Sequence, residues 1–245
     1  MIEPIMLLHI GTSGFSYKEW KGSFYPADLP QAKMLAFYAE RFSTVEINNT
    51  FYRMPNEGTL AGWTRQVPAA FRFVLKAPQR ITHQKKLADA GDDVRRLFDA
   101  AAALGDHLGP VLFQLPPYLR ADAARLEAFL GELPEDRAVA FEFRHASWDA
   151  EPIRGTLAGR RIAVCAADTD ESPVSALPPA TAPWGYLRLR RAAYEAADLE
   201  RWAERIAAQP WEEAWVFFKH EEEGKGPAFA RMFAEAAGRI GLALA

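Results

Sequence analysis

Charged side chains recur at the ends of short apolar segments along this sequence. Three carboxylates and three cations form the pattern, each near the end of a different segment: Glu46, Glu142, Asp168, Lys76, Arg188 and Lys219. Groups of this kind shift one another's pKa values when they lie close together, which is how proteins obtain general acids and bases. The pattern predicts a catalytic site in which Glu46 and Glu142 are the acid and base candidates. Lys76 would be an electrostatic stabiliser or a base.

Two further arginines give this pattern an excess of positive charge. Arg144 comes two residues after Glu142, and Arg190 comes two residues after Arg188. Side chains two apart on a strand project to the same side, with Cα atoms about 6.5 to 7 Å apart. Two or three arginines could therefore hold one phosphate through paired hydrogen bonds. We expect an anionic small molecule or a nucleic-acid fragment as the ligand.

Other polar side chains near the segment ends are candidates for substrate binding. They are Ser13, Tyr17, Asn48, His83, Gln114 and His145. His83, His145 and His220, together with the carboxylates, suggest a metal-dependent sugar isomerase or hydrolase as one alternative. No two of these histidines have the tight spacing of metal ligands, and the neighbouring Lys and Arg residues would repel a cation. We therefore expect no metal and no other cofactor.

Aromatic residues are concentrated in the loop that follows the first apolar segment, residues 11–26. This loop contains Phe15, Tyr17, Trp20, Phe24 and Tyr25. Its backbone N–H groups could bind an anion, and its rings could stack on a base or a sugar. The simpler interpretation is that the rings pack against one another at the rim of the fold. The loop favours a second alternative, a non-catalytic protein that binds nucleotides or nucleic acid.

The elements that must position these residues alternate between strands and helices. We expect eight strands at 6–10, 44–48, 71–76, 111–115, 139–143, 162–166, 185–190 and 214–219. We expect helices at 32–41, 59–66, 92–104, 123–130, 150–157, 198–208 and 227–240. The proline-rich link after the sixth strand should have no full helix. Eight strand and helix pairs in a chain of this length predict an α/β fold, a single (β/α)8 TIM-type barrel over residues 1–245.

The barrel explains why the polar residues recur where they do. One face of each strand is apolar and suits the covering helices, so the polar face should point into the barrel. Active sites of such barrels lie at the C-terminal ends of the strands. No glycine-rich phosphate-binding motif follows any strand, which argues against a dinucleotide or P-loop sheet. The leading function is thus an enzyme, either a hydrolase, a lyase or an isomerase, acting on an anionic substrate at this mouth.

Composition restricts the class of protein further. The chain has 245 residues, 49% of them hydrophobic, and its net charge is 29 − 32 = −3, so a basic coat for gripping DNA is absent. Cys165 is the one cysteine, and its apolar neighbours predict a thiol buried in the core. A chain with a single cysteine cannot form an internal disulfide, which indicates a reducing compartment. Glu3 and Pro4 do not suit a signal peptide. Four prolines interrupt the longest uncharged stretch, residues 172–187, so we expect a cytoplasmic protein without membrane contact.

The same segments resemble those of the YecE-like proteins, a family defined by a domain of unknown function. The resembling segments are Gly11 to Phe15 with Trp20 and Phe24 to Pro26, Thr44 to Asn48, Thr50 to Arg53 with Pro55, Phe73 to Lys76 with Thr82 and His83, Phe113 to Pro117, Glu142 to His145 with Trp148, Tyr186 to Arg190, and Phe218 to His220. The resemblance spans almost the whole chain and implies a single TIM-type barrel. It implies no particular reaction, because this fold hosts many chemistries.

Overall fold

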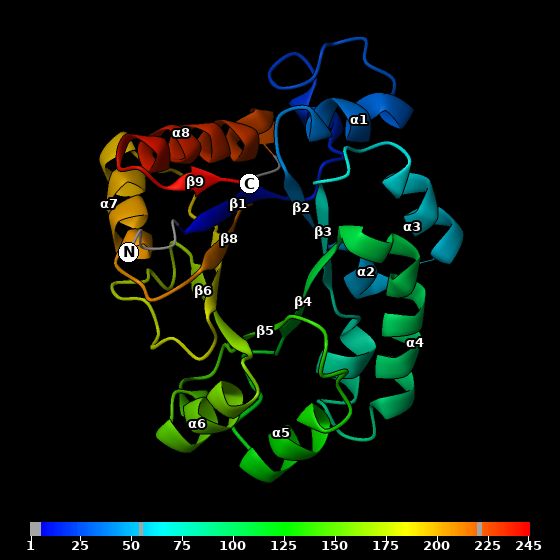
Figure 1. Ribbon diagram of the computed structural model, residues 1–245, viewed down its shortest axis with the longest axis vertical. Coiled ribbons are helices and arrows are strands. Elements are labelled where there is room, and N and C mark those ends of the chain that lie inside the picture. Colours follow the sequence, from blue (N-terminus) through cyan, green and yellow to red (C-terminus); the bar gives the residue numbers. More distant parts are fainter. Residues whose placement is uncertain (1–5, 54–55, 220–221) are drawn as a thin grey trace, which may run out of the picture.

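Eight parallel strands close into a barrel in the computed structural model, which describes residues 6–53, 56–219 and 222–245 (Figure 1). They are β1 (Leu7–Ser13), β2 (Thr44–Ile47), β3 (Arg72–Lys76), β4 (Leu108–Gln114), β5 (Val139–Glu142), β6 (Ala163–Asp168), β7 (Trp184–Leu189) and β8 (Glu213–Phe218). Neighbours pair in chain order, and β1 closes the ring by pairing with both β8 and β2. The expected (β/α)8 barrel is confirmed.

Helices surround the ring of strands (Figure 1). They are α1 (Met34–Ala39), α2 (Asn49–Tyr52), α3 (Glu57–Thr64), α4 (Gly91–Ala101), α5 (Ala123–Leu130), α6 (Glu151–Gly159), α7 (Ala196–Ala207) and α8 (Lys225–Arg239). Asp122 begins α5 by accepting a hydrogen bond from the Arg125 N–H. The link at 169–183 has no helix, as expected. Within the described ranges, no helix is both long and apolar enough to cross a bilayer.

Several short elements were not anticipated from the sequence. A two-residue strand, β9 (Ala243–Leu244), pairs with Leu7 and Leu8 at the start of β1. The short helical segments are η1 (Lys18–Trp20), η2 (Gln31–Lys33), η3 (Arg80–Gln84), η4 (Ala102–His107, which begins inside the expected helix 92–104 and is kinked at Gly105), η5 (Ala146–Trp148) and η6 (Glu222–Gly224). Elements this short have no hydrophobic period that a sequence pattern could reveal.

The barrel interior is apolar over most of its length and polar at one end. Its buried apolar lining consists of Val74, Leu112, Ala140, Ala163, Cys165, Ala182, Trp184, Tyr186, Trp215 and Phe217. His9 stacks on Trp215 with ring centroids 3.8 Å apart, which fills the N-terminal half. Cys165 is buried as expected, and burial raises the pKa of its thiol well above the usual range. The polar residues occupy the C-terminal end, above this lining.

The joint between β1 and β2 is unusually close and includes a side chain from α1. A Cβ atom on Gly11 would lie 2.1 Å from the Thr44 carbonyl oxygen, so no larger residue fits. The Tyr38 hydroxyl accepts a hydrogen bond from the Thr12 N–H at 2.8 Å and donates one to the Thr44 carbonyl at 3.0 Å. A helix side chain thereby ties together the two strands that carry Ser13 and Glu46.

Candidate functional site

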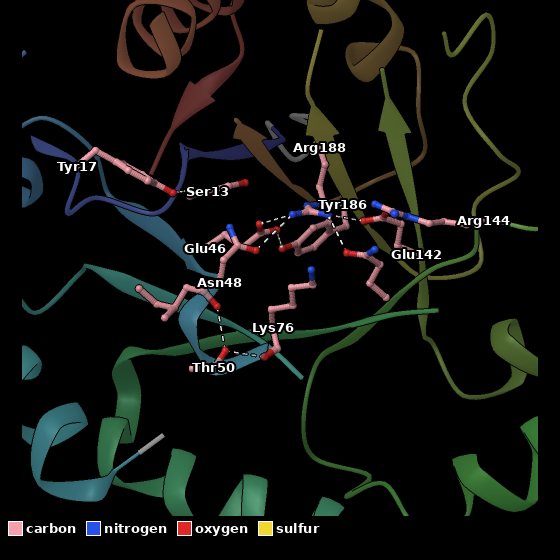
Figure 2. Close-up of polar contacts among 12 residues, drawn as sticks. Ser13, Tyr17, Glu46, Asn48, Thr50, Lys76, Glu142, Arg144, Tyr186 and Arg188 are labelled. Atoms are coloured by element: carbon pink, nitrogen blue, oxygen red, sulfur yellow. Dashed lines mark hydrogen bonds and ion pairs between the residues drawn. The ribbon is translucent and has the colours of Figure 1, made fainter. Parts of the chain in front are cut away.

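Arg188 lies at the centre of a buried charge cluster in the C-terminal end of the barrel (Figure 2). Its side chain projects from β7 and is 1% exposed. Its Nη2 donates to Glu46 Oε1 at 2.9 Å, and its Nη1 donates to Glu142 Oε2 at 2.5 Å. One guanidinium therefore joins carboxylates from β2 and β5 across the barrel. We call Glu46, Glu142 and Arg188 the central cluster.

The remaining carboxylate oxygens of the central cluster also have donors. The Tyr186 hydroxyl donates to Glu46 Oε2 at 2.7 Å, and Arg144 Nε donates to Glu142 Oε1 at 2.8 Å. Each of the four oxygens thus accepts at least one hydrogen bond. This arrangement fixes both carboxylates in place and compensates for their burial.

Both carboxylates are ionised at neutral pH. Burial by itself would raise the pKa of Glu142, but the nearby Arg188 and Arg144 outweigh it and lower that pKa to about 2. For Glu46, burial is likewise outweighed by the charge of Arg188 and the Tyr186 hydrogen bond, so its pKa is below the usual range. The two groups can accept protons. Neither suits the acid half of the acid and base pair that the sequence suggested.

Lys76 ends β3 and extends toward the central cluster, and it has no ion pair with any residue that the structure describes (Figure 2). It is 9% exposed, and its Nζ lies 4.0 Å from the centroid of the Phe51 ring. Burial and the charge of Arg188 lower the pKa of its ammonium group to about 8. The Thr50 hydroxyl lies 2.5 Å from the Lys76 carbonyl oxygen and fixes the strand end. The amine is therefore mostly protonated at neutral pH, with a minor neutral fraction that an ordinary lysine lacks.

Arg190 is a second cation for which the described residues supply no partner. It follows β7 by one residue, is half-buried, and its side chain has no hydrogen bond or ion pair with any residue that the structure describes. Burial and the neighbouring charge of Arg188 lower its pKa. Four cations, Lys76, Arg144, Arg188 and Arg190, thus surround the two carboxylates of the central cluster, which leaves an excess of 4 − 2 = +2.

Unsatisfied hydrogen-bond donors accompany this excess charge. Among the described residues, Asn48 Nδ2, Arg188 Nε and Arg190 Nε are buried and have no acceptor. Asn48 Oδ1 accepts from Arg188 Nη2 at 3.4 Å. The Nδ2 group of the same amide is therefore not used by Arg188. Gln114 faces the same space with its Oε1 3.5 Å from Arg188 Nη1. Buried donors without acceptors are rare in proteins and are satisfied when a ligand supplies the acceptor.

Asp168 does not join this site, in contrast to the expectation from the sequence. On β6 the residues that face into the barrel are Ala163, Cys165 and Ala167, which places Asp168 on the opposite face. Its carboxylate accepts hydrogen bonds from the Tyr194 hydroxyl and from Arg191. Asp168 therefore holds the loop after β7, and the balance of three carboxylates against three cations is wrong.

The expected clamp of Arg188 and Arg190 on one anion also differs from what the structure contains. Both terminal nitrogens of Arg188 are occupied by carboxylates, whereas Arg190 has no such partner among the described residues. Lys219 follows β8 and is half-buried, and its backbone N–H donates to the Leu189 carbonyl. Arg188 therefore holds Glu46 and Glu142 in place. A ligand has to bind to the other cations of the site.

Of the predicted histidines, His83 adjoins the site through the Phe51 ring and the charges of Lys76, Arg144 and Glu142, whereas His145 caps a short helix. His83 lies in the turn η3, where its ring meets the Phe51 ring edge to face, and burial and Lys76 lower its pKa so that it is neutral. His145 Nδ1 accepts a hydrogen bond from the Ser147 N–H and caps η5. His220 lies outside the described residues. In the part of the chain that the structure describes, no three His, Cys, Asp or Glu residues form a possible metal-ligand group.

A pocket of about 330 Å³ adjoins the site on the side of the aromatic loop. Phe15, Tyr17, Asn48 and Trp63 are among its lining residues. Trp20, Phe24 and Tyr25 are instead buried in the core, which agrees with the packed-rim interpretation for these rings. The Tyr17 hydroxyl donates to the carbonyl of Ser13, whose Cα pairs with that of Glu46 across the β1–β2 joint. Asn48 is the residue that this pocket shares with the site, because its Oδ1 lies 3.4 Å from Arg188 Nη2.

Two aromatic residues of the site were missed by the sequence analysis. Tyr186 lies on β7 in the same register as Arg188 and Arg190, and that spacing was the available signal. Phe51 lies in α2, which was not predicted, so nothing marked it as the ring beneath Lys76.

Two curated bacterial proteins are similar to part of this chain. The chain is 28% identical over 146 residues to YecE of Escherichia coli K12, which covers 59% of this chain and 51% of that protein. It is 27% identical over 159 residues to YunF of Bacillus subtilis 168, covering 60% of this chain and 54% of that protein. Both relatives are described as UPF0759 proteins, and the chain spans about half the length of each.

Solved structures extend the likeness to nearly the whole chain. A DUF72 family protein from Thermotoga maritima has a TM-score of 0.79 at 26% identity, covering 94% of this chain and 98% of that one. One from Enterococcus faecalis V583 also has a TM-score of 0.79, at 20% identity, covering 95% and 96%. The family model described as protein of unknown function DUF72 matches residues 9–243. The chain therefore belongs to the DUF72 family.

Proposed function

We propose that this protein is an enzyme that acts on a small anionic substrate at the C-terminal mouth of its barrel. The observation that carries the proposal is the pair of cations, Lys76 and Arg190, that have no ion pair among the described residues beside a charge cluster with an excess of +2. Burial of unpaired charge is costly, and an anionic ligand would remove that cost. Phosphate and carboxylate groups are the anions that suit arginine and lysine.

Each residue of the site would have a distinct role. Arg190 and the partly exposed edge of Arg144 would bind the anionic group, and the free Asn48 N–H would donate to a neighbouring oxygen of the substrate. Glu46 and Glu142 would accept protons, because both are ionised. Arg188 would position these two carboxylates without touching the substrate anion.

Catalysis is favoured over simple binding by the ionisable groups. A binding site for an anion needs cations but has no use for two buried, ionised carboxylates beside it. An amine with a pKa of about 8 is also close to the operating pH at which acid and base catalysis is most effective. Strongly perturbed groups of this kind, gathered at the catalytic end of a barrel, are typical of active sites.

Calorimetric titration with inorganic phosphate at low ionic strength tests the proposal. We expect the wild-type protein to bind phosphate and Arg190→Gln to bind it about tenfold more weakly, since a hydrogen bond to a charged group contributes about 1.5 to 3 kcal/mol. The control is Arg96→Gln, which removes an exposed arginine on α4 and should leave the affinity unchanged. Equal affinities of the wild type and the Arg190 variant would contradict the proposal.

The same titration with a short single-stranded oligonucleotide distinguishes the two classes of ligand. A protein that contacts several phosphates of a strand loses affinity steeply with salt, with a log-log slope of about −0.7 for each phosphate contact. A small-molecule enzyme with one anion site should bind the oligonucleotide no more tightly than phosphate. A steep slope together with much tighter binding would instead favour a nucleic-acid binder that uses the pocket next to Asn48.

A further inference from the structure

We propose that the Lys76 amine is a nucleophile that forms an imine with the carbonyl group of an anionic aldehyde or ketone. This inference deepens the proposed function and rests on it for the anionic part of the substrate. It concerns the class of reaction, which the charge balance of the mouth does not reveal. The inference rests on the geometry around Lys76.

Lys76 differs from every other lysine in the described part of the chain. It is buried, whereas the others are exposed or half-buried. A buried lysine is ordinarily paired with a carboxylate, but no carboxylate oxygen of the described residues lies within ion-pair distance of its Nζ. Its Nζ lies over the Phe51 ring, and burial and the charge of Arg188 outweigh the opposite effect of Glu46 and Glu142 on its pKa. Desolvation beside another cation is the setting in which lysine amines become nucleophiles.

The groups around Lys76 suit each stage of imine formation. The amine nitrogen attacks the carbonyl carbon, the C–N bond forms, and the π electrons of the carbonyl move to its oxygen. The proton lost from nitrogen passes to that oxygen, for which the ionised Glu46 or Glu142 provides a relay. The ammonium proton that Lys76 gave up before the attack, held meanwhile by Glu46 or Glu142, is returned to the hydroxyl group, which leaves as water while the C=N bond forms. Overall, the lysine ammonium and the carbonyl compound give a protonated imine and one water, so no oxidant or reductant is needed.

The cations of the mouth would stabilise and orient this intermediate. Arg190 lies one residue beyond the end of β7, and thus further out along the barrel than Arg188, with its guanidinium unpaired among the described residues. A substrate whose anion lies against Arg190 would extend its carbonyl inward toward Lys76, which ends β3. The substrate class is therefore a small aldehyde or ketone that bears a phosphate or a carboxylate.

Borohydride trapping of the full chain tests this directly. The protein is incubated with dihydroxyacetone phosphate, or with pyruvate as the carboxylate probe, and then reduced with sodium borohydride, which converts an imine into a stable secondary amine. Peptide mapping by mass spectrometry locates the adduct. We expect modification of Lys76 at least tenfold above that of the exposed Lys33 in the same sample. Dihydroxyacetone without phosphate should label Lys76 less.

Two variants separate this inference from the proposed function. Lys76→Arg keeps the positive charge but has no nucleophilic amine, so it should still bind inorganic phosphate and give no adduct at position 76. Arg190→Gln should reduce labelling of Lys76 by the phosphate probe more than labelling by uncharged dihydroxyacetone. If Lys76 is labelled no more than Lys33 while phosphate still binds, the imine is wrong and the anion site stands. If the wild-type protein does not bind phosphate, both the imine and the anion site are wrong.

Discussion

Arg188 is a buried cation shared by two carboxylates, and this sharing determines what the site can bind. Glu46 and Glu142 raise its pKa well above the usual range despite its burial. An external phosphate that displaced Glu46 would leave that buried carboxylate without an ion pair among the described residues, and one that displaced Glu142 would leave it only Arg144, so either displacement is costly. The anion therefore has to bind to a cation that is still available. Arg190 meets this condition.

We expect Arg188→Lys to destabilise the protein by about 2 to 4 kcal/mol, because one ammonium group cannot replace two directed guanidinium contacts with Glu46 and Glu142. Urea unfolding followed by circular dichroism measures the change. The control is Arg190→Lys, which should leave the free energy of unfolding nearly unchanged while weakening phosphate binding. The interpretation is wrong if the two variants have equal stability.

Alternation along the strands was enough to predict most residues of the site. Glu46, Lys76, Gln114, Glu142 and Arg188 all face inward as their spacing indicates. Their pairing could not be predicted, because it joins positions far apart in the chain. Asp168 was misplaced for a physical reason: the residues before it on β6 are small and apolar on both faces, so its side could not be assigned from the pattern.

Secondary structure was predictable wherever an element carries a local signal. The helix at 123–130 begins and ends where expected because Asp122 supplies a cap and apolar residues recur at helical spacing. Residues 80–84, which include His83, form one wide turn with no such signal. Tyr38 illustrates the same limit between elements, since its position in α1 predicts burial but not its insertion between β1 and β2.

We expect Tyr38→Phe to lower the free energy of unfolding by about 1 to 3 kcal/mol. The change would leave the buried Thr12 N–H and Thr44 carbonyl without the hydroxyl that now joins them. Thermal or urea unfolding measures the loss, with Tyr118→Phe as the control because Tyr118 is 63% exposed. A loss no larger than that of the control would show that the two strands pair equally well without the phenol.

Across the whole molecule, the charge of the site opposes the charge of the protein. The net charge is −3, yet the barrel mouth holds an excess of positive groups. A cationic mouth in an anionic molecule attracts small anions to one place while the rest of the surface repels them. The barrel makes this possible, because strands from all parts of the chain end in the same small area.

The buried carboxylates also connect the site with the stability of the whole protein in acid. The pKa of Glu142 falls from an ordinary value of 4.5 to about 2 in the folded state, so its ionised form stabilises the fold. Because the folded pKa is depressed, this stabilisation is complete above about pH 5 and is lost as the pH falls toward 2. It amounts to a few kcal/mol. The unfolded chain binds the additional proton in this range, which is why stability decreases as the pH is lowered.

We therefore expect the free energy of unfolding to drop between pH 5 and 2 and the drop to be smaller in Glu142→Gln, which has no carboxylate to protonate there. The variant should also be less stable at pH 7, since the glutamine amide cannot balance the charges of Arg188 and Arg144. Urea unfolding at a series of pH values measures both effects. Glu127→Gln, an exposed position on α5, is the matched control and should follow the wild-type curve. If Glu142→Gln also follows that curve, the carboxylate is not held ionised by the two arginines, and the charge balance argued for the mouth fails with it.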